Sequence, residues 1–142
     1  DILTLALEYQ QQFDVVFGIA ILHHIPSPEL RRKAVAHVYQ ALKPGGTLVL
    51  TVWNLWQPRF WMAHVRALLK QQDLDFGDLL IPWKGSAAPK VQAYRYYHAF
   101  IPCELRRLLQ KSGFQIVDGY YGKQGQRKHW WQGNNLVVVA KK

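Results

Sequence analysis

Apolar residues are concentrated in two runs near the start of the chain, residues 13–22 and 47–53. Nearly continuous apolar, β-branched runs predict strands that are buried on both faces, as in a parallel sheet. Between them, apolar residues recur at helical spacing after Ser27, a typical N-cap residue, and Pro28, which suits the first turn. The sequence Pro44-Gly45-Gly46 is expected to end this helix. Strand, helix and strand in this order predict a right-handed crossover unit.

The pattern is less regular between residues 54 and 100, which we interpret as an insertion. A helix is predicted after Pro58, and the glycines and prolines of residues 77–93 predict a loop. Helical spacing returns at Pro102 and stops at Gly113. Two further strands are predicted at residues 114–122 and 134–142. Because no helix separates them, we expect an α/β fold whose mostly parallel sheet carries an antiparallel hairpin at its edge.

Length and composition exclude several classes of protein. The 142 residues correspond to one domain, and a hydrophobic fraction of 49% excludes global disorder. The single cysteine, Cys103, excludes a disulfide scaffold and a cysteine-rich zinc site, and it fits a reducing compartment. No apolar run approaches the roughly 20 residues of a membrane span. We therefore expect a cytoplasmic protein with no membrane partner and no metal site.

The net charge of +9 is unevenly distributed along the chain. Residues 1–83 hold 7 Lys and Arg against 7 Asp and Glu, whereas residues 84–142 hold 11 Lys and Arg against only Glu104 and Asp118. Cations and aromatic residues alternate in the strip around Arg127, Lys128 and Trp130, a composition typical of surfaces that bind single-stranded RNA. The alternative is a solvated basic turn with Trp130 packed against the sheet.

Four segments carry a resemblance to a known family: FDVVFGIAILHHI, LKPGGTLVLTVW, SGFQIVDGYY and NLVVVAKK. They resemble the second half of the class I S-adenosylmethionine-dependent methyltransferases. The resemblance implies that residues 1–142 form the C-terminal part of a Rossmann-like methyltransferase domain. It also implies that Asp1 and Ile2 contact the adenine of the cofactor S-adenosylmethionine, and that Ala20 and Ile21 lie under it.

The glycine-rich loop that follows the family's first strand does not occur in this sequence. The chain starts at Asp1, and its only methionine is Met62. We therefore expect the chain to be part of a longer protein and to be inactive alone. Without its upstream neighbour, the strand at residues 13–22 is expected to leave an apolar edge open.

Three further segments, IAILHHI, VWNLWQ and AYRYYHAF, resemble the tRNA wobble-uridine carboxymethyl methyltransferases. That family esterifies a carboxymethyl group on uridine C5. A carboxylate is ionised at neutral pH, so it needs positioning rather than a general base. We expect Arg95 and His98 to orient the carboxylate, and Tyr96 and Tyr97 to stack on the uracil or donate hydrogen bonds. The alternative is a strand whose alternate residues pack into a core.

Further substrate-binding candidates follow the two predicted strands, because ligands of α/β sheets bind outside the carboxyl ends. They are His24 or its neighbour His23, then Trp53, Asn54 and Gln57. The alternative is that one histidine caps the strand while the other packs, and that Trp53 belongs to the core. We expect tRNA as partner, and a small activating subunit is a further candidate. Two other functions stay open: a small-molecule methyltransferase, or a non-catalytic half that binds RNA or supports a partner.

Overall fold

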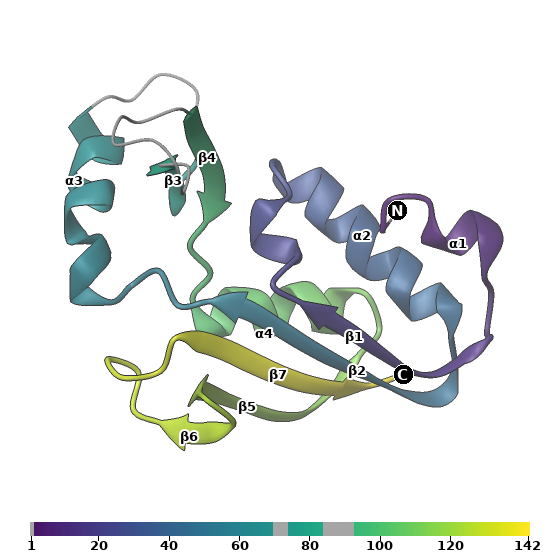
Figure 1. The fold of residues 1–142 in the computed structure, drawn as a ribbon. Coiled ribbons are helices and arrows are strands. Elements are labelled where there is room, and N and C mark those ends of the chain that lie inside the picture. The colour runs from purple at the N-terminus through teal and green to yellow at the C-terminus, as the bar shows by residue number, and fades with distance from the viewer. Residues whose placement is uncertain (1, 70–73, 84–92) are drawn as a thin grey trace.

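The computed structural model describes residues 2–69, 74–83 and 93–142, and it has an α/β fold (Figure 1). The main sheet contains β1 (Phe13–Ile19), β2 (Leu42–Trp53), β5 (Gln115–Lys123), β6 (Gln126–Lys128) and β7 (Asn135–Lys141). The helices are α1 (Leu5–Glu8), α2 (Pro28–Ala41), α3 (Trp61–Leu69) and α4 (Pro102–Lys111), with 3-10 turns η1 (Leu22–His24) and η2 (Pro58–Phe60). A separate two-stranded sheet pairs β3 (Asp78–Trp83) with β4 (Ala93–His98).

The five strands of the main sheet are ordered β1-β2-β7-β5-β6. β1 and β2 are parallel, and α2 connects them, which confirms the predicted crossover unit. β7 pairs antiparallel with β2 on one side and with β5 on the other. The α/β fold with antiparallel strands toward one edge is therefore as predicted, although the last strand lies inside the sheet rather than at its edge.

The main core lies between the sheet and the helices α2 and α4. Ala34 and Val38 of α2 and Leu105 and Leu109 of α4 are buried against sheet residues such as Val138. The predicted burial of the first strand on both faces is wrong for the described residues. One face of β1 is exposed, at Val15, Phe17 and Ile19. The physical reason is that α2 and α4 cover only one face of the sheet.

The ends of α2 follow the local chemistry of the sequence. The Ser27 hydroxyl accepts a hydrogen bond from the Leu30 N–H at 3.3 Å, as expected of an N-cap. After the helix, Gly45 has a φ of +77°, which L-residues with side chains rarely adopt. β2 begins at Leu42, directly after the helix and earlier than residue 47, because the turn already pairs with the sheet.

The prediction of a loop over residues 77–93 is wrong for its first part, because residues 78–83 form β3. Asp78 lies opposite His98 and Ile81 opposite Arg95 in the antiparallel pairing with β4. Pro82 is compatible with this strand because a two-stranded sheet has only edge strands. Residues 84–92 lie outside the described part of the chain.

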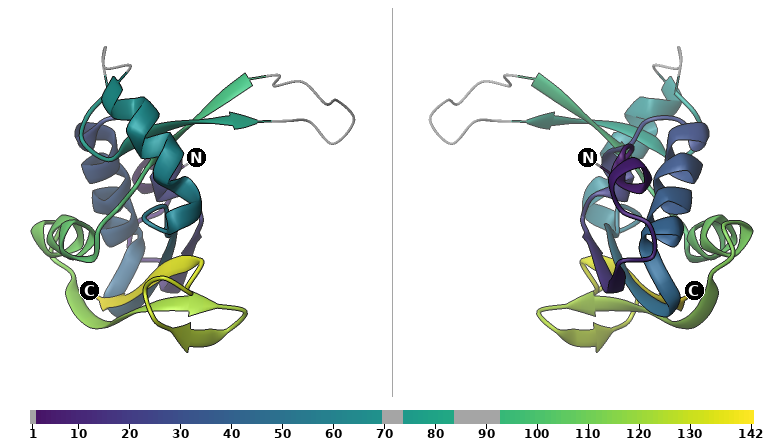
Figure 2. Two further views of the ribbon diagram at one scale, coloured as in Figure 1. Left: turned by 90° about the vertical axis from the view of Figure 1, so that its left-hand side faces the viewer. Right: turned by 90° about the vertical axis from the view of Figure 1, so that its right-hand side faces the viewer.

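The insertion has a small core of its own. Leu55, Leu79, Tyr97 and Ala99 are buried together, and α3 packs against them through Ala63 and other residues. The insertion lies beyond the carboxyl ends of β1 and β2 (Figure 1), and its β3–β4 hairpin projects from the body of the molecule (Figure 2). Within the described residues, no helix is long and apolar enough to cross a bilayer.

Candidate active site at the carboxyl ends of the strands

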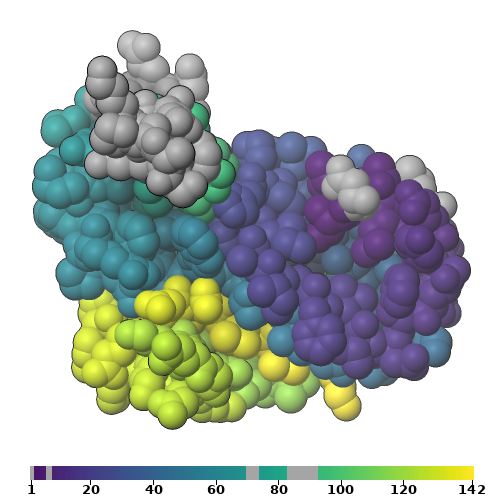
Figure 3. Space-filling view, in the orientation of Figure 1, coloured from purple at the N-terminus to yellow at the C-terminus, as the bar shows by residue number. Residues whose placement is uncertain are grey.

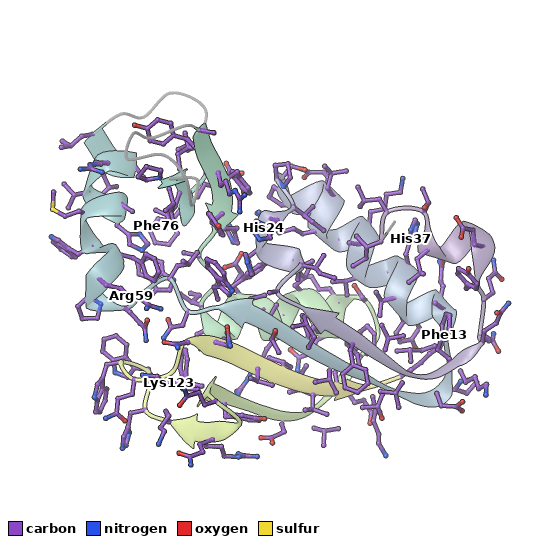
Figure 4. The ribbon with its side chains drawn as sticks, viewed as in Figure 1. Phe13, His24, His37, Arg59, Phe76 and Lys123 are labelled. Atoms are coloured by element: carbon purple, nitrogen blue, oxygen red, sulfur yellow. The ribbon has the colours of Figure 1, made fainter. Side chains whose placement is uncertain are left out.

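Four aromatic side chains from three segments meet at the carboxyl ends of β1 and β2. η1 supplies His23 and His24, β2 ends at Trp53, and β4 supplies Tyr97, and we call these residues the aromatic cluster. The Tyr97 ring stacks on Trp53 with centroids 5.2 Å apart and lies 4.7 Å from the His24 ring. Figure 4 shows His24 where η1 faces the hairpin. Tyr97 is buried, whereas His24 is exposed and Trp53 is 40% exposed, so the cluster opens to solvent on one side.

His23 is fully buried at the centre of this cluster. Its Nδ1 accepts a hydrogen bond from the Trp53 backbone N–H at 3.2 Å, so the neutral ring carries its proton on Nε2. Nε2 has no hydrogen-bond partner among the described residues. Burial, together with the neighbouring His24, lowers the pKa of His23 to about 4. The ring is therefore neutral at physiological pH and joins the end of β2 to η1.

Five polar side chains, which we call the buried polar network, tie the hairpin to the helices. Asp78 Oδ1 accepts hydrogen bonds at 2.7 Å from the Tyr96 hydroxyl and from His98 Nδ1. Arg31 of α2 donates to the Tyr96 hydroxyl at 3.0 Å and lies 4.0 Å from Asp78. His98 Nε2 lies 2.7 Å from a carboxylate oxygen of Glu104 on α4. The network therefore fixes the orientation of β4 relative to the main sheet.

The network also determines which residues of the R-Y-Y-H run face the cluster. Tyr96 and His98 point into the network, and burial together with Asp78, opposed by Arg31, raises the pKa of the Tyr96 phenol above its ordinary value. Tyr97 points to the aromatic cluster. Arg95 is exposed and shares its side of β4 with Tyr97, because side chains in a strand alternate between faces. Of the four predicted catalytic residues, Arg95 and Tyr97 are therefore on the cluster side.

Asn54 and Gln57, predicted to contact the substrate, are buried and hold the loop of residues 129–133, which we call the tryptophan loop. Asn54 Nδ2 donates to the carbonyl oxygens of Trp130 at 2.6 Å and Gly133 at 2.9 Å. Gln57 Nε2 donates to the same Gly133 oxygen at 2.8 Å. In this structure both amides position the loop that carries Trp130.

The basic strip lies on this loop and on the strand before it. Lys128 is exposed, and Trp130 is 49% exposed. Arg127 forms an ion pair with Asp118 and stacks over the Tyr120 ring, with its guanidinium 4.2 Å from the centroid. Part of the charge of Arg127 is therefore already compensated within the protein, and Lys128 is the more available cation.

The predicted cofactor residues lie partly at the end of β1. Ala20 has a φ of +55°, and its N–H donates to the Thr51 carbonyl at 3.0 Å, which turns the chain out of the sheet. The side chains of Ile19 and Ile21 are exposed at this turn. They form a small apolar surface at the end of β1. Ile2 is half-buried against the main core, and Asp1 lies outside the described residues.

Sequence reasoning missed Asp78, Arg31 and Glu104, which lie far apart in the sequence and meet only in the folded chain. A spacing rule does not find such a set. Only Glu104 among these three had a local signal, because it is an acidic residue in the first turn of α4. Asp78 gave no such signal, because the glycines and prolines around it predict a loop.

Comparison with curated proteins shows related methyltransferases. The chain is 28% identical over 148 aligned positions to the tRNA (carboxymethyluridine(34)-5-O)-methyltransferase of Schizosaccharomyces pombe, covering 92% of this chain and 58% of that protein. It is 33% identical over 115 positions to the ubiquinone biosynthesis O-methyltransferase of Xanthomonas euvesicatoria, covering 80% of this chain and 40% of that protein. The chain thus spans less than two thirds of the length of these relatives.

Solved structures agree on the fold. A SAM-dependent methyltransferase from Methanosarcina mazei superimposes with a TM-score of 0.66 at 22% identity, over 94% of this chain and 61% of that one. The 1,6-didemethyltoxoflavin-N1-methyltransferase of Burkholderia thailandensis superimposes with a TM-score of 0.60 at 22% identity, over 98% of this chain and 48% of that one. Residues 4–118 match the family described as a methyltransferase domain. The chain therefore belongs to the methyltransferase domain family.

Proposed function

We propose that the chain is the acceptor-binding part of an S-adenosylmethionine-dependent methyltransferase that esterifies the carboxymethyl group of a wobble uridine in tRNA. The observation that carries this proposal is the position of Tyr97. The hairpin places its ring on Trp53 and beside His24, at the strand ends where ligands of α/β sheets bind. The similarity to the fission yeast tRNA methyltransferase over 92% of the chain supports the same substrate.

The apolar surface at Ile19 and Ile21 fits one side of the cofactor. Ala20, Ile21 and Ile2 are the described residues that would hold it, and Asp1 remains a further candidate. When bound, S-adenosylmethionine supplies an electrophilic methyl group that a carboxylate oxygen accepts without the loss of a proton. This chemistry does not need a general base, and the neutral, buried His23 is consistent with a positioning role.

The chain's own residues would act by orientation and by exclusion of water. The exposed Trp53 ring, backed by Tyr97, offers a stacking face for uracil. Arg95, on the same side of β4 as Tyr97, would orient the carboxylate through its guanidinium. The buried polar network would hold both residues in place, so Tyr96 and His98 contribute to the site through position rather than contact.

The partner in this proposal is tRNA, held through its phosphates by exposed cations such as Lys128. A small activating subunit and a cytoplasmic location remain predictions from the sequence.

A second candidate function is methylation of a small phenolic or quinol acceptor. The similarity to the ubiquinone biosynthesis O-methyltransferase, at 33% identity over 80% of the chain, favours it. Such an acceptor would use the aromatic cluster but not the basic strip.

One assay separates the two candidates. Intact protein is incubated with methyl-labelled S-adenosylmethionine and one of three acceptors: tRNA with carboxymethyluridine, the same tRNA without that modification, or a soluble quinol. We expect label only in the first tRNA. Label in the quinol alone would replace the proposal by the second candidate. Label in none of the three acceptors would reject both candidate functions.

A further inference from the structure

A second aromatic site lies beside the aromatic cluster. A hollow between the start of α3 and the tryptophan loop is lined by Trp56, Gln57, Pro58, Trp61, His64 and Trp130, and we call it the aromatic hollow. Figure 3 shows the α3 segment, in teal, directly above the yellow C-terminal part of the chain at this side of the molecule. Tyr97, His24 and Trp53 do not contribute to its lining, so the hollow is distinct from the aromatic cluster.

The inner wall of the aromatic hollow is held in place before any ligand binds. Trp56 Nε1 donates to the Ala99 carbonyl at 3.0 Å, and its ring stacks on His64 at 4.3 Å. His64 Nε2 is 2.9 Å from the Leu55 carbonyl oxygen, so this ring is fixed as well. A wall that is already ordered loses little conformational entropy on binding.

The outer wall is aromatic and accessible. Trp61 is 67% exposed and Trp130 is 49% exposed. Trp130 belongs to the tryptophan loop, whose carbonyl groups are fixed by the buried amides of Asn54 and Gln57. These two amides therefore hold the loop that carries Trp130 at the edge of the aromatic hollow.

The charge around the aromatic hollow indicates what it binds. Among the residues that the structure describes, none of those lining the hollow is acidic. Arg59 follows Pro58 of the lining in the sequence. It is exposed, stacks over Phe60 and donates to Asn134 Oδ1 at 3.4 Å, and Figure 4 shows it at the base of α3. Lys128 and His129 adjoin Trp130 in the sequence, and His129 stacks on Trp131 at 4.6 Å. Aromatic faces surrounded by cations fit a nucleobase with its phosphate, whereas an apolar protein segment gains nothing from the cations.

We propose that the aromatic hollow binds an unpaired nucleobase of an RNA strand, stacked against Trp61 and Trp130, with Arg59 and Lys128 facing the adjoining phosphates. The identification of this RNA as tRNA rests on the proposed function, but the chemistry of the hollow does not. In tRNA, the base would be one that neighbours the modified nucleotide in the anticodon loop.

The test measures binding of two RNAs to the intact protein by fluorescence anisotropy: a labelled anticodon stem-loop and a labelled duplex of equal length. We expect Trp61→Ala and Trp130→Ala each to weaken binding of the stem-loop about tenfold, and Trp61→Phe to keep most of the affinity. Leu69→Ala is the matched control, because Leu69 is 80% exposed on the same helix outside the lining. None of the four variants should change binding of the duplex, which offers no free base.

Equal stem-loop affinity of the wild type, Trp61→Ala and Trp130→Ala would overturn the proposal. So would an equal loss for both RNAs, which would indicate general misfolding or charge effects. A change only in the oligomeric state, measured by light scattering, would assign the hollow to protein contacts instead. Methylation of tRNA by the wild type is measured separately. If methylation is absent but the tryptophan variants lose stem-loop binding, then the proposed function is wrong, whereas the proposal that the aromatic hollow binds a nucleobase is retained.

Discussion

His23 connects three parts of the candidate site through one ring. It accepts a hydrogen bond from the end of β2, belongs to η1, and stacks with Tyr97 of the hairpin at 5.7 Å. The hydrogen bond that Nδ1 accepts needs a neutral imidazole, and the ring is fully buried. A protonated ring would lose the Nδ1 acceptor and would place a charge in an apolar environment.

The lowered pKa of His23 predicts a loss of stability in acid. The value is about 4 in the folded chain and 6.5 when unfolded, so the unfolded state binds the proton more readily. Stability should be complete above pH 6.5 and fall as the pH decreases toward 4, by up to about 3 kcal/mol. Urea unfolding at a series of pH values measures this slope.

The variant His23→Phe should have a smaller slope between pH 6.5 and 4 than the wild type, whatever its absolute stability. His129→Phe, which changes an exposed histidine outside the aromatic cluster, is the control. An unchanged slope in His23→Phe would show that other groups cause the acid sensitivity.

Arg95 allows a second prediction at the scale of one residue. If its guanidinium orients the acceptor carboxylate, Arg95→Ala should reduce methyl transfer about 10- to 100-fold, corresponding to a hydrogen bond with a charged group. The cofactor affinity should stay the same. Tyr94→Ala, at an exposed neighbouring position, should leave both quantities unchanged. Equal losses of transfer and of cofactor affinity would place Arg95 elsewhere.

Most elements of the main sheet could be predicted from the sequence because their signals are local, but β6, in the predicted basic turn, was not predicted. The cap at Ser27 and the stripe of Leu105 and Leu109 each act within a few residues, whereas α2 ends at Ala41, before the predicted stop at Pro44-Gly45-Gly46. β3 could not be predicted, since its pairing with β4 depends on a partner about 15 residues away. The exposure of β1 on one face could not be predicted either, because burial depends on which helices cover the sheet.

The same division applies to the candidate site. Tyr97, Trp53 and His24 could be predicted because all three adjoin strand ends. The three side chains do contact one another in the structure. It did not show that Asn54 and Gln57 face the tryptophan loop, or that Tyr96 and His98 face Asp78. Those directions depend on strand alternation and on residues from distant segments.

The buried polar network predicts how firmly the hairpin is attached. Asp78→Asn leaves Arg31 without its carboxylate in a buried position and should destabilise the fold by about 3 kcal/mol. Asp14→Asn is the control, because the Asp14–Lys43 ion pair is exposed, and it should cost less than about 1 kcal/mol. Urea unfolding monitored by tryptophan fluorescence compares the two. Similar small losses would show that the network does not stabilise the hairpin.

The distribution of charge over the whole molecule predicts how RNA binding depends on salt. Lys123 and Lys128 lie in the basic half of the chain and are exposed. Replacing both by glutamine should weaken tRNA binding and decrease the slope of log affinity against log salt by about 0.7 to 0.9 for each phosphate that the variant no longer neutralises. Lys33→Gln, on α2 in the half with balanced charge, should leave the slope unchanged. A slope that is equal in all three proteins would contradict a role for the basic strip.

The most direct test of the central claim is the chemical nature of the methyl group after transfer. Intact protein, methyl-labelled S-adenosylmethionine and tRNA with carboxymethyluridine are incubated, and the tRNA is then treated with mild alkali and digested for nucleoside mass spectrometry. A methyl ester on the wobble uridine is predicted, so alkali should release the label as methanol and regenerate carboxymethyluridine. Label that survives alkali, or that is found in another nucleoside, would contradict the assignment of a carboxylate acceptor.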